Sequence, residues 1–115
     1  MEGVRKKRVE SALQNKIGSM IIGSEINDPR IHTMLTVTKL DISKDGVYAD
    51  VFISSLQPEN SLSTSIEALN HAAGFIQKHI SKSIKLKNTP KLRFHIDTSI
   101  REGFEINEKM KDLNI

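Results

Sequence analysis

The 115-residue chain lacks cysteine and tryptophan, and it contains only one tyrosine and four phenylalanines. Without cysteine it forms no disulfide and no thiolate site, which suits a reducing cytosol, so we expect a cytoplasmic location. Its longest apolar runs span two or three residues, whereas a bilayer-spanning helix needs roughly 18. No apolar segment follows the basic start MEGVRKKRVE. We therefore expect neither a membrane span nor a secretory signal.

Negative charge is missing from one long part of the chain. Residues 68–96 hold six lysines and arginines and no acid, a net charge of +6. Residues 1–16 carry +3, residues 17–67 carry −4 and residues 97–115 carry −2, within an overall charge of +3. Charge segregated in this way indicates a positive surface that faces an anionic partner.

Helical periodicity marks the N-terminal end of the chain. Apolar residues recur there at intervals of three and four, at Val9, Leu13, Ile17, Met20 and Ile21. This spacing predicts an amphipathic helix over about residues 4–24. The helix ends before Pro29, because the residue that precedes a proline is pushed out of the helical region.

Three later segments alternate between apolar and polar residues, as half-buried strands do. They are MLTVTKLDI (34–42), VYADVFIS (47–54) and KLRFHID (91–97), and the turn SKDG joins the first two into a hairpin. The inward positions of the first strand change phase near Thr38, which predicts a β-bulge there. Tyr48 and Phe52 fall on the outer face, where they either cover the sheet or stack on bases.

The longest predicted helix runs from about Asn60 to Ile84, between the hairpin and the third strand. The order of elements is then helix, strand, strand, helix, kinked helix, strand. With 37% hydrophobic residues, this order predicts one α+β domain over residues 1–115, with a three-stranded sheet covered by helices on one face. We expect a short helical tail over about residues 98–115.

Gly74 lies in the middle of that longest helix, although glycine in a helix interior costs up to about 1 kcal/mol relative to alanine. We interpret Gly74 as a corner that exposes the backbone amides of the following helix, and such amides attract phosphate. On a straight helix Phe75 would project into the basic face and could stack on a base. The alternative, which we favour, is that the break at Gly74 rotates the second half of the helix and turns Phe75 inward.

A basic face follows the same helix. The core stripe on one side consists of Leu69, Ala73, Ile76, Ile80 and Ile84. Lys78, Lys82 and Lys85 fall on the opposite side, with His71 among them. An ordinary solvated face usually mixes charges of both signs, so the absence of acids favours a binding surface.

Three short motifs lie at the junctions between the predicted elements. The order αββααβ is that of a type II KH domain, but no two glycines have the spacing of the RNA-clamping GxxG loop. Its place is taken by Ala72-Ala73-Gly74. The other two motifs are Asn27-Asp28-Pro29-Arg30 and Thr89-Pro90-Lys91-Leu92-Arg93-Phe94. Together with the element order they resemble bacterial ribosome-binding factor A, over essentially the whole chain from about Arg8 to Met110.

The resemblance implies a cytoplasmic assembly factor that matters most in the cold. Such a factor binds the immature 30S ribosomal subunit and its 16S rRNA, assists maturation of the 5′ end of that RNA, and leaves before translation. The resemblance also implies that the Ala72–Gly74 kink replaces the clamping loop and that Lys78, Lys82, Lys85 and Lys87 meet RNA. We expect a monomer with no cofactor and no small-molecule substrate.

Two further basic segments are candidates for RNA contact. Arg5, Lys6, Lys7 and Arg8 are either a solvated terminus or an arm that neutralises phosphates. For Asp28-Pro29-Arg30 we favour a structural role, in which Arg30 pairs with Asp28 or Glu25. The alternative is a bidentate contact between Arg30 and phosphate.

The sequence contains no catalytic or metal-binding constellation. The four histidines have no partner at ligand spacing, so we expect no metal. The segment that starts at Asp41 resembles a calcium loop, but its twelfth position is Phe52 in place of the required Glu, so we read a hairpin turn. No carboxylate pair flanks the basic surface. We predict a non-catalytic RNA-binding protein; its rivals are a general single-stranded nucleic-acid-binding KH module and a small RNA nuclease.

Overall fold

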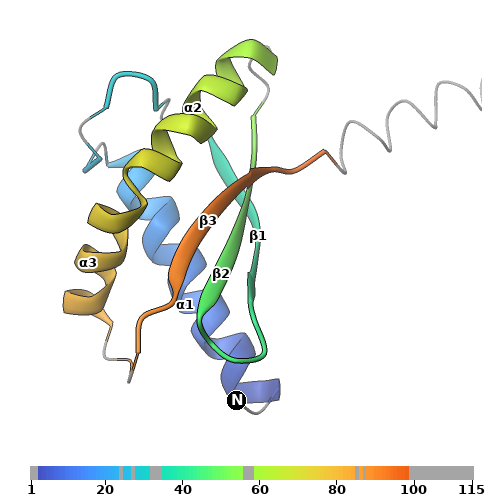
Figure 1. The fold of residues 1–115 in the computed structure, drawn as a ribbon, viewed down its shortest axis with the longest axis vertical. Helices are drawn as coiled ribbons and strands as arrows, with labels where there is room; N and C mark the ends of the chain where they lie inside the picture. The colour runs from blue at the N-terminus through green and yellow to red at the C-terminus, as the bar shows by residue number, and fades with distance from the viewer. Residues whose placement is uncertain are drawn as a thin grey trace, which may run out of the picture.

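The computed structural model describes residues 3–23, 25–26, 28–31, 35–55, 59–84, 86 and 88–98. They form helix α1 (Gly3–Ile22), strands β1 (Thr36–Ile42) and β2 (Tyr48–Ser54), helices α2 (Glu59–His71) and α3 (Ala73–Ser83), and strand β3 (Lys91–Ile96) (Figure 1). The α+β class and the order αββααβ are as predicted. The predicted tail lies outside the described residues from residue 99 onward.

The sheet has the strand order β1-β2-β3. β1 and β2 are antiparallel, whereas β2 and β3 are parallel, because the chain crosses over through α2 and α3 between them. The predicted hairpin turn is confirmed. Gly46 adopts a positive φ of 75°, which glycine tolerates without a steric penalty, and Asp45 Oδ1 accepts hydrogen bonds from the Ser43 hydroxyl and the Val47 N–H.

The predicted β-bulge is also present. The register of β1 against β2 shifts between Val37 and Lys39, so Thr38 is the extra residue. Without the bulge a strict two-residue period would turn the second half of β1 to the wrong face. With it, Val37 packs against the core and Leu40 and Ile42 are buried in it.

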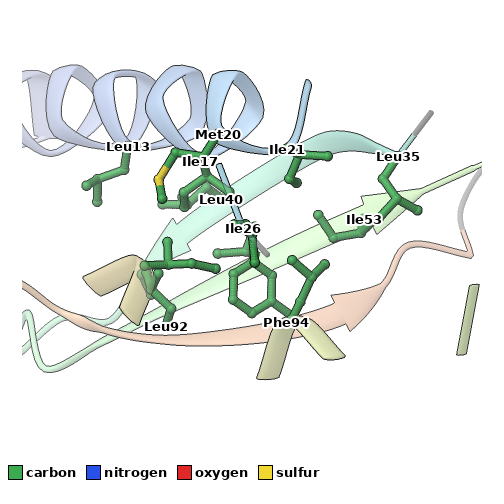
Figure 2. Packing of buried hydrophobic residues seen from close by; sticks show 14 of the residues in the cluster. Leu13, Ile17, Met20, Ile21, Ile26, Leu35, Leu40, Ile53, Leu92 and Phe94 are labelled. Atoms are coloured by element: carbon green, nitrogen blue, oxygen red, sulfur yellow. The ribbon is translucent and has the colours of Figure 1, made fainter. Parts of the chain in front are cut away.

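Helices α1, α2 and α3 pack on one face of the sheet, around a cluster of buried side chains. Figure 2 shows part of this cluster, between α1 and the strands. The predicted stripe of α1 is confirmed, since Leu13, Ile17, Met20 and Ile21 are buried and Val9 is half-buried. The strands contribute alternate residues, which leaves their other face open to solvent. The buried residues that the strands contribute to the core are Leu40, Ile42, Ala49, Val51, Ile53, Leu92 and Phe94.

The predicted break in the long helix is real, but its predicted position at Gly74 is wrong. α2 ends at His71 and α3 begins at Ala73, so the break is at Ala72, whose φ of −87° and ψ of 0° leave the helical range. Gly74 lies inside the first turn of α3. Alanine can adopt the bridge conformation at Ala72, so the break needs no glycine.

Candidate nucleic-acid interface

The junction between α2 and α3 is a tight corner at Ala72, whose backbone N–H and carbonyl both form helical hydrogen bonds. The N–H of Ala72 donates to Ala68 at 3.0 Å, and the carbonyl of Ala72 accepts from Ile76 at 2.9 Å. No side chain caps the start of α3. The first N–H groups of a helix have no partner within it, so the amides from Ala73 to Phe75 are suited to an external acceptor such as phosphate.

Two polar contacts hold the second half of α2 and therefore the position of this junction. The Asn70 carboxamide makes two hydrogen bonds to the backbone of Phe94 in β3. The hydroxyl of Ser65, which is fully buried, donates to the carbonyl of Arg30. The first contact ties α2 to the sheet and the second ties it to the turn that follows α1.

The outer face of α3 carries an aromatic ring among cations. Phe75 is 53% exposed, and Lys78 and Lys82 are exposed beside it. The ring of Phe75 lies 6.2 Å from that of His79, measured between centroids. We call Phe75, Lys78, His79 and Lys82 the α3 face; a rotation of 100° per residue places them within about 100° of one another.

The favoured prediction that Phe75 turns inward is wrong. The break consists of the single residue Ala72, and it does not change the rotational phase of the helix. The core stripe therefore continues across the junction: Leu69, Ile76 and Ile80 are buried, whereas Ala73 and Ile84 are half-buried. Phe75 keeps the outward position that a straight helix gives it.

Gly74 is exposed, and a Cβ built on it would meet nothing within 4 Å. Its backbone does not adopt the left-handed conformation that favours glycine. The folded chain therefore has no steric need for glycine here. What the missing side chain provides is an open path to the uncapped amides of α3.

The remaining residues predicted for this surface are only partly placed. His71 is the last residue of α2 and is exposed next to the junction. Ala72 and Ala73 are half-buried at the corner itself. Lys85 and Lys87 lie outside the described residues.

Arg30 lies beside the junction and is paired with Asp28, as the structural interpretation predicts. Its Nε and Nη2 donate to the two carboxylate oxygens of Asp28 at 3.1 and 2.9 Å, and its backbone N–H donates at 2.9 Å. These bonds from Arg30 hold the pKa of the Asp28 carboxyl below its ordinary value, and the charge of the nearby His71 adds a smaller effect. A phosphate would have to compete with Asp28 for the guanidinium.

The basic arm Arg5–Arg8 is not brought to the junction. It forms the first turns of α1, with Arg5, Lys7 and Arg8 exposed and Lys6 half-buried. Glu10, one turn later, accepts the N–H of Ile42 at 2.8 Å and so places this end of α1 beside the hairpin turn. The arm and the α3 face are two separate basic surfaces.

Phe75 and His79 are missing from the residues predicted to contact RNA. The helical rotation angles contained the signal, because they place both side chains next to Lys82 on the outer face. Within the described residues, no three side chains of the metal-ligating types are grouped as a metal site requires. None of the helices in this part of the chain is long and apolar enough to cross a membrane.

Comparisons with known proteins agree with this fold. A family model described as ribosome-binding factor A matches residues 5–110. A curated ribosome-binding factor A from Borreliella burgdorferi (strain ZS7) is 42% identical over 113 residues, which cover 98% of this chain and 94% of the relative.

Solved structures share the same architecture. A Thermotoga maritima protein solved by NMR has a TM-score of 0.69 at 32% identity, over 83% of this chain and 89% of that one. A homology model of the Thermus thermophilus ribosome-binding factor A, fitted into a cryo-EM map of a 30S complex, has a TM-score of 0.63 at 23% identity, over 79% and 93% of the two chains. The match to the family model over most of its length shows that the chain belongs to the ribosome-binding factor A family.

Proposed function

We propose that this chain is a non-catalytic, cytoplasmic RNA-binding factor that acts on the immature 30S subunit. One observation carries the proposal most directly. The α3 face combines an exposed aromatic ring, two exposed lysines and an uncapped helix start, and α3 contains no acidic residue. Family membership and the 30S complex of the Thermus thermophilus relative support the small subunit as the partner.

The mechanism that follows is electrostatic and shape-based. Lys78 and Lys82 neutralise backbone phosphates of 16S rRNA, and Lys85 and Lys87 extend this contact. The amides from Ala73 to Phe75 face a phosphate, which the absent side chain of Gly74 allows to approach closely. Phe75 stacks on an unpaired base, because every base offers a π-face to an aromatic ring.

The residues beside the junction have secondary roles in this account. His71 borders the corner, and Arg30 exchanges its Asp28 partner for phosphate only when RNA is close. Arg5, Lys6, Lys7 and Arg8 contact a second stretch of RNA backbone, because they lie on a separate surface. Held in this way as a monomer, the factor keeps rRNA in one arrangement and assists maturation of the 16S 5′ end, most of all in the cold.

Sedimentation tests the proposal. Purified protein is mixed with immature small subunits, mature small subunits or 70S ribosomes at two salt concentrations. We expect salt-sensitive cosedimentation that prefers immature subunits and is absent from 70S. Failure to sediment with any particle, combined with retained binding to short RNA, would instead indicate a general single-stranded nucleic-acid-binding KH module.

Cleavage of RNA by the pure protein is the second test of the proposal. A substrate of 5′-extended 16S rRNA is incubated with the pure protein and analysed on a gel. We expect no cleavage, since no carboxylate of α3 is available as a general base. Cleavage that increases with protein concentration and survives further purification would contradict the non-catalytic assignment.

A further inference from the structure

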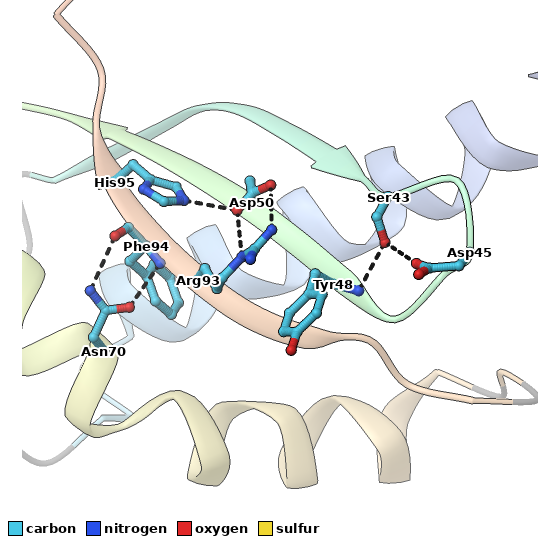
Figure 3. Close-up of polar contacts among 8 residues, drawn as sticks. All are labelled: Ser43, Asp45, Tyr48, Asp50, Asn70, Arg93, Phe94 and His95. Carbon is cyan, nitrogen blue, oxygen red and sulfur yellow. Dashed lines mark hydrogen bonds and ion pairs between the residues drawn. The ribbon is translucent and has the colours of Figure 1, made fainter.

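The face of the sheet that the helices leave uncovered carries an ordered cluster of rings and charges (Figure 3). The parallel register places Tyr48 beside Lys91, Asp50 beside Arg93 and Phe52 beside His95. β1 adds Lys39, which the register places opposite Phe52. We call this the outer sheet face; its members are Lys39, Tyr48, Asp50, Phe52, Lys91, Arg93 and His95.

Asp50 holds two of these side chains in place. Its Oδ1 accepts hydrogen bonds from Arg93 Nε at 2.9 Å and pairs with His95 Nε2 at 2.8 Å, while its Oδ2 accepts from Arg93 Nη2 at 3.1 Å. Burial raises the pKa of the Asp50 carboxyl, but the hydrogen bonds from Arg93 and His95 outweigh burial and lower it overall. The carboxylate therefore stays ionised and keeps both partners oriented.

The oriented side chains form two flat surfaces on the outer sheet face. The imidazole of His95 lies 5.3 Å from the ring of Phe52, at an interplanar angle of 31°. The guanidinium of Arg93 lies over the ring of Tyr48, with its Cζ 4.1 Å from the ring centroid. Asp50, Phe52, Arg93 and His95 line a shallow depression of about 510 Å³ between them. Arg93 and His95 remain 49% and 44% exposed at their side chains.

We propose that the outer sheet face binds single-stranded RNA, with one unpaired base on the Phe52–His95 pair and a second on the Arg93 guanidinium above Tyr48. Unpaired bases stack on aromatic side chains and on arginine planes, and sheets with outward rings are used in this way. Because Asp50 orders these groups before binding, little side-chain entropy is lost when a base arrives.

The charges of the face suit RNA better than a protein surface. The face holds the cations Lys39, Lys91 and Arg93 and one acid, Asp50, which is paired with Arg93 and His95. Two further acids border it: Asp41 is paired with Lys39 at 3.2 Å, and Asp97, which follows β3, accepts a hydrogen bond from the Thr38 hydroxyl. The face includes no aliphatic side chain, whereas the cores of protein–protein interfaces are depleted in charge. Lys39 and Lys91 are exposed at its two sides, where they can neutralise flanking phosphates.

This surface is independent of the α3 face. The helices cover one side of the sheet and the outer sheet face is the other side, so one RNA segment cannot occupy both at close range. The protein can then hold two separate stretches of RNA. Binding at the outer sheet face depends mainly on stacking, so its salt dependence should be weaker than that of the α3 face.

The chain carries its own probe for this site, because Tyr48 is its only tyrosine and there is no tryptophan. The intact protein is titrated with hexa-adenylate RNA, and both Tyr48 fluorescence and the anisotropy of a fluorescein-labelled copy are followed. We expect saturable quenching of Tyr48. The double variant Phe52→Leu with His95→Gln, which keeps apolar cover but removes both rings, should weaken binding by about tenfold or more.

The matched control is Asn15→Ala, an exposed position of α1 outside the proposed RNA surfaces, which should bind hexa-adenylate with little change. Thermal unfolding verifies that each variant is folded. Equal hexa-adenylate affinity of the Phe52/His95 variant and the original protein would overturn the proposal. Unchanged Tyr48 fluorescence at saturating RNA would do so as well, and would leave the α3 face and the arm Arg5–Arg8 as the RNA surfaces.

Discussion

Asn70 at the end of α2 pairs with both backbone groups of Phe94 in β3. Its Oδ1 accepts the Phe94 N–H at 2.8 Å and its Nδ2 donates to the Phe94 carbonyl at 3.1 Å (Figure 3). β3 is an edge strand, and these are groups that it turns away from β2. The Asn70 side chain thus pairs two backbone groups of the edge strand and fixes the helix corner next to them.

Asn70→Ala should destabilise the fold. Two hydrogen bonds are lost and the edge of β3 is left unpaired, so we expect a loss of about 1–3 kcal/mol in the free energy of unfolding by urea. The matched control is Asn15→Ala, an exposed position in α1, which should change stability little or raise it slightly. A variant at position 70 as stable as the Asn15 control would show that the pairing contributes nothing.

Gly74→Ala should separate stability from binding. Open space around the Cβ position predicts unchanged stability, or a gain of up to about 1 kcal/mol, because alanine favours helix. The added methyl group should weaken cosedimentation with immature subunits, since it covers the amides of α3. Gly18→Ala, which also meets nothing within 4 Å, should show the same stability change with native binding. Native binding by Gly74→Ala would show that close approach of a phosphate to the amides of α3 is not part of the mechanism.

Phe75→Gln should leave the fold intact and reduce binding. The ring is 53% exposed, so we expect a stability change within about 0.5 kcal/mol. Loss of one stacked base should weaken subunit binding by roughly five- to hundredfold. Phe75→Tyr keeps a ring and should retain most of the affinity. If Gln and Tyr bind alike, Phe75 does not stack on rRNA.

The stability difference between the original protein and Asp50→Asn should depend on pH. The folded state lowers the Asp50 pKa below its ordinary 3.8, so the carboxylate stabilises the fold above that pH, and this stabilisation is lost as pH falls through the folded pKa. Thermal unfolding should show the variant less stable at neutral pH and the difference shrinking below pH 3.8. Asp41→Asn, whose pair with Lys39 is exposed, serves as the control. A stability difference that stays constant across this pH range would contradict the lowered pKa of Asp50 in the folded state.

Much of the fold could be predicted from the sequence because burial imposes strong periodicity. The stripe from Val9 to Ile21 fixed α1, and the phase change near Thr38 located the bulge, because a strand with one buried face cannot slip by one residue. The pairing of Arg30 with Asp28 was one of the two expected, the other being a pairing with Glu25.

The helix corner could not be located in the same way. Propensity pointed to Gly74, yet tertiary contacts decide where a helix breaks, and Asn70 and Ser65 hold α2 in place up to its last residue, His71. Those contacts join residues 24 and 35 positions apart, which no local pattern reveals. The same limit applies to the Asp50–Arg93–His95 cluster, because it depends on the parallel pairing of β2 and β3.

The most direct test of the central claim measures the affinity of the protein for immature small subunits as a function of salt. Lys78→Glu with Lys82→Glu is compared with the original chain and with Lys16→Glu plus Lys44→Glu, which changes the net charge equally elsewhere. If the α3 face holds rRNA, the first variant loses affinity and the magnitude of its log–log salt slope falls by about 1.5, since each phosphate contact contributes about 0.7–0.9. The second variant should retain most of the affinity and most of the salt slope of the original chain. Equal slopes and equal affinities for the two variants would contradict the account.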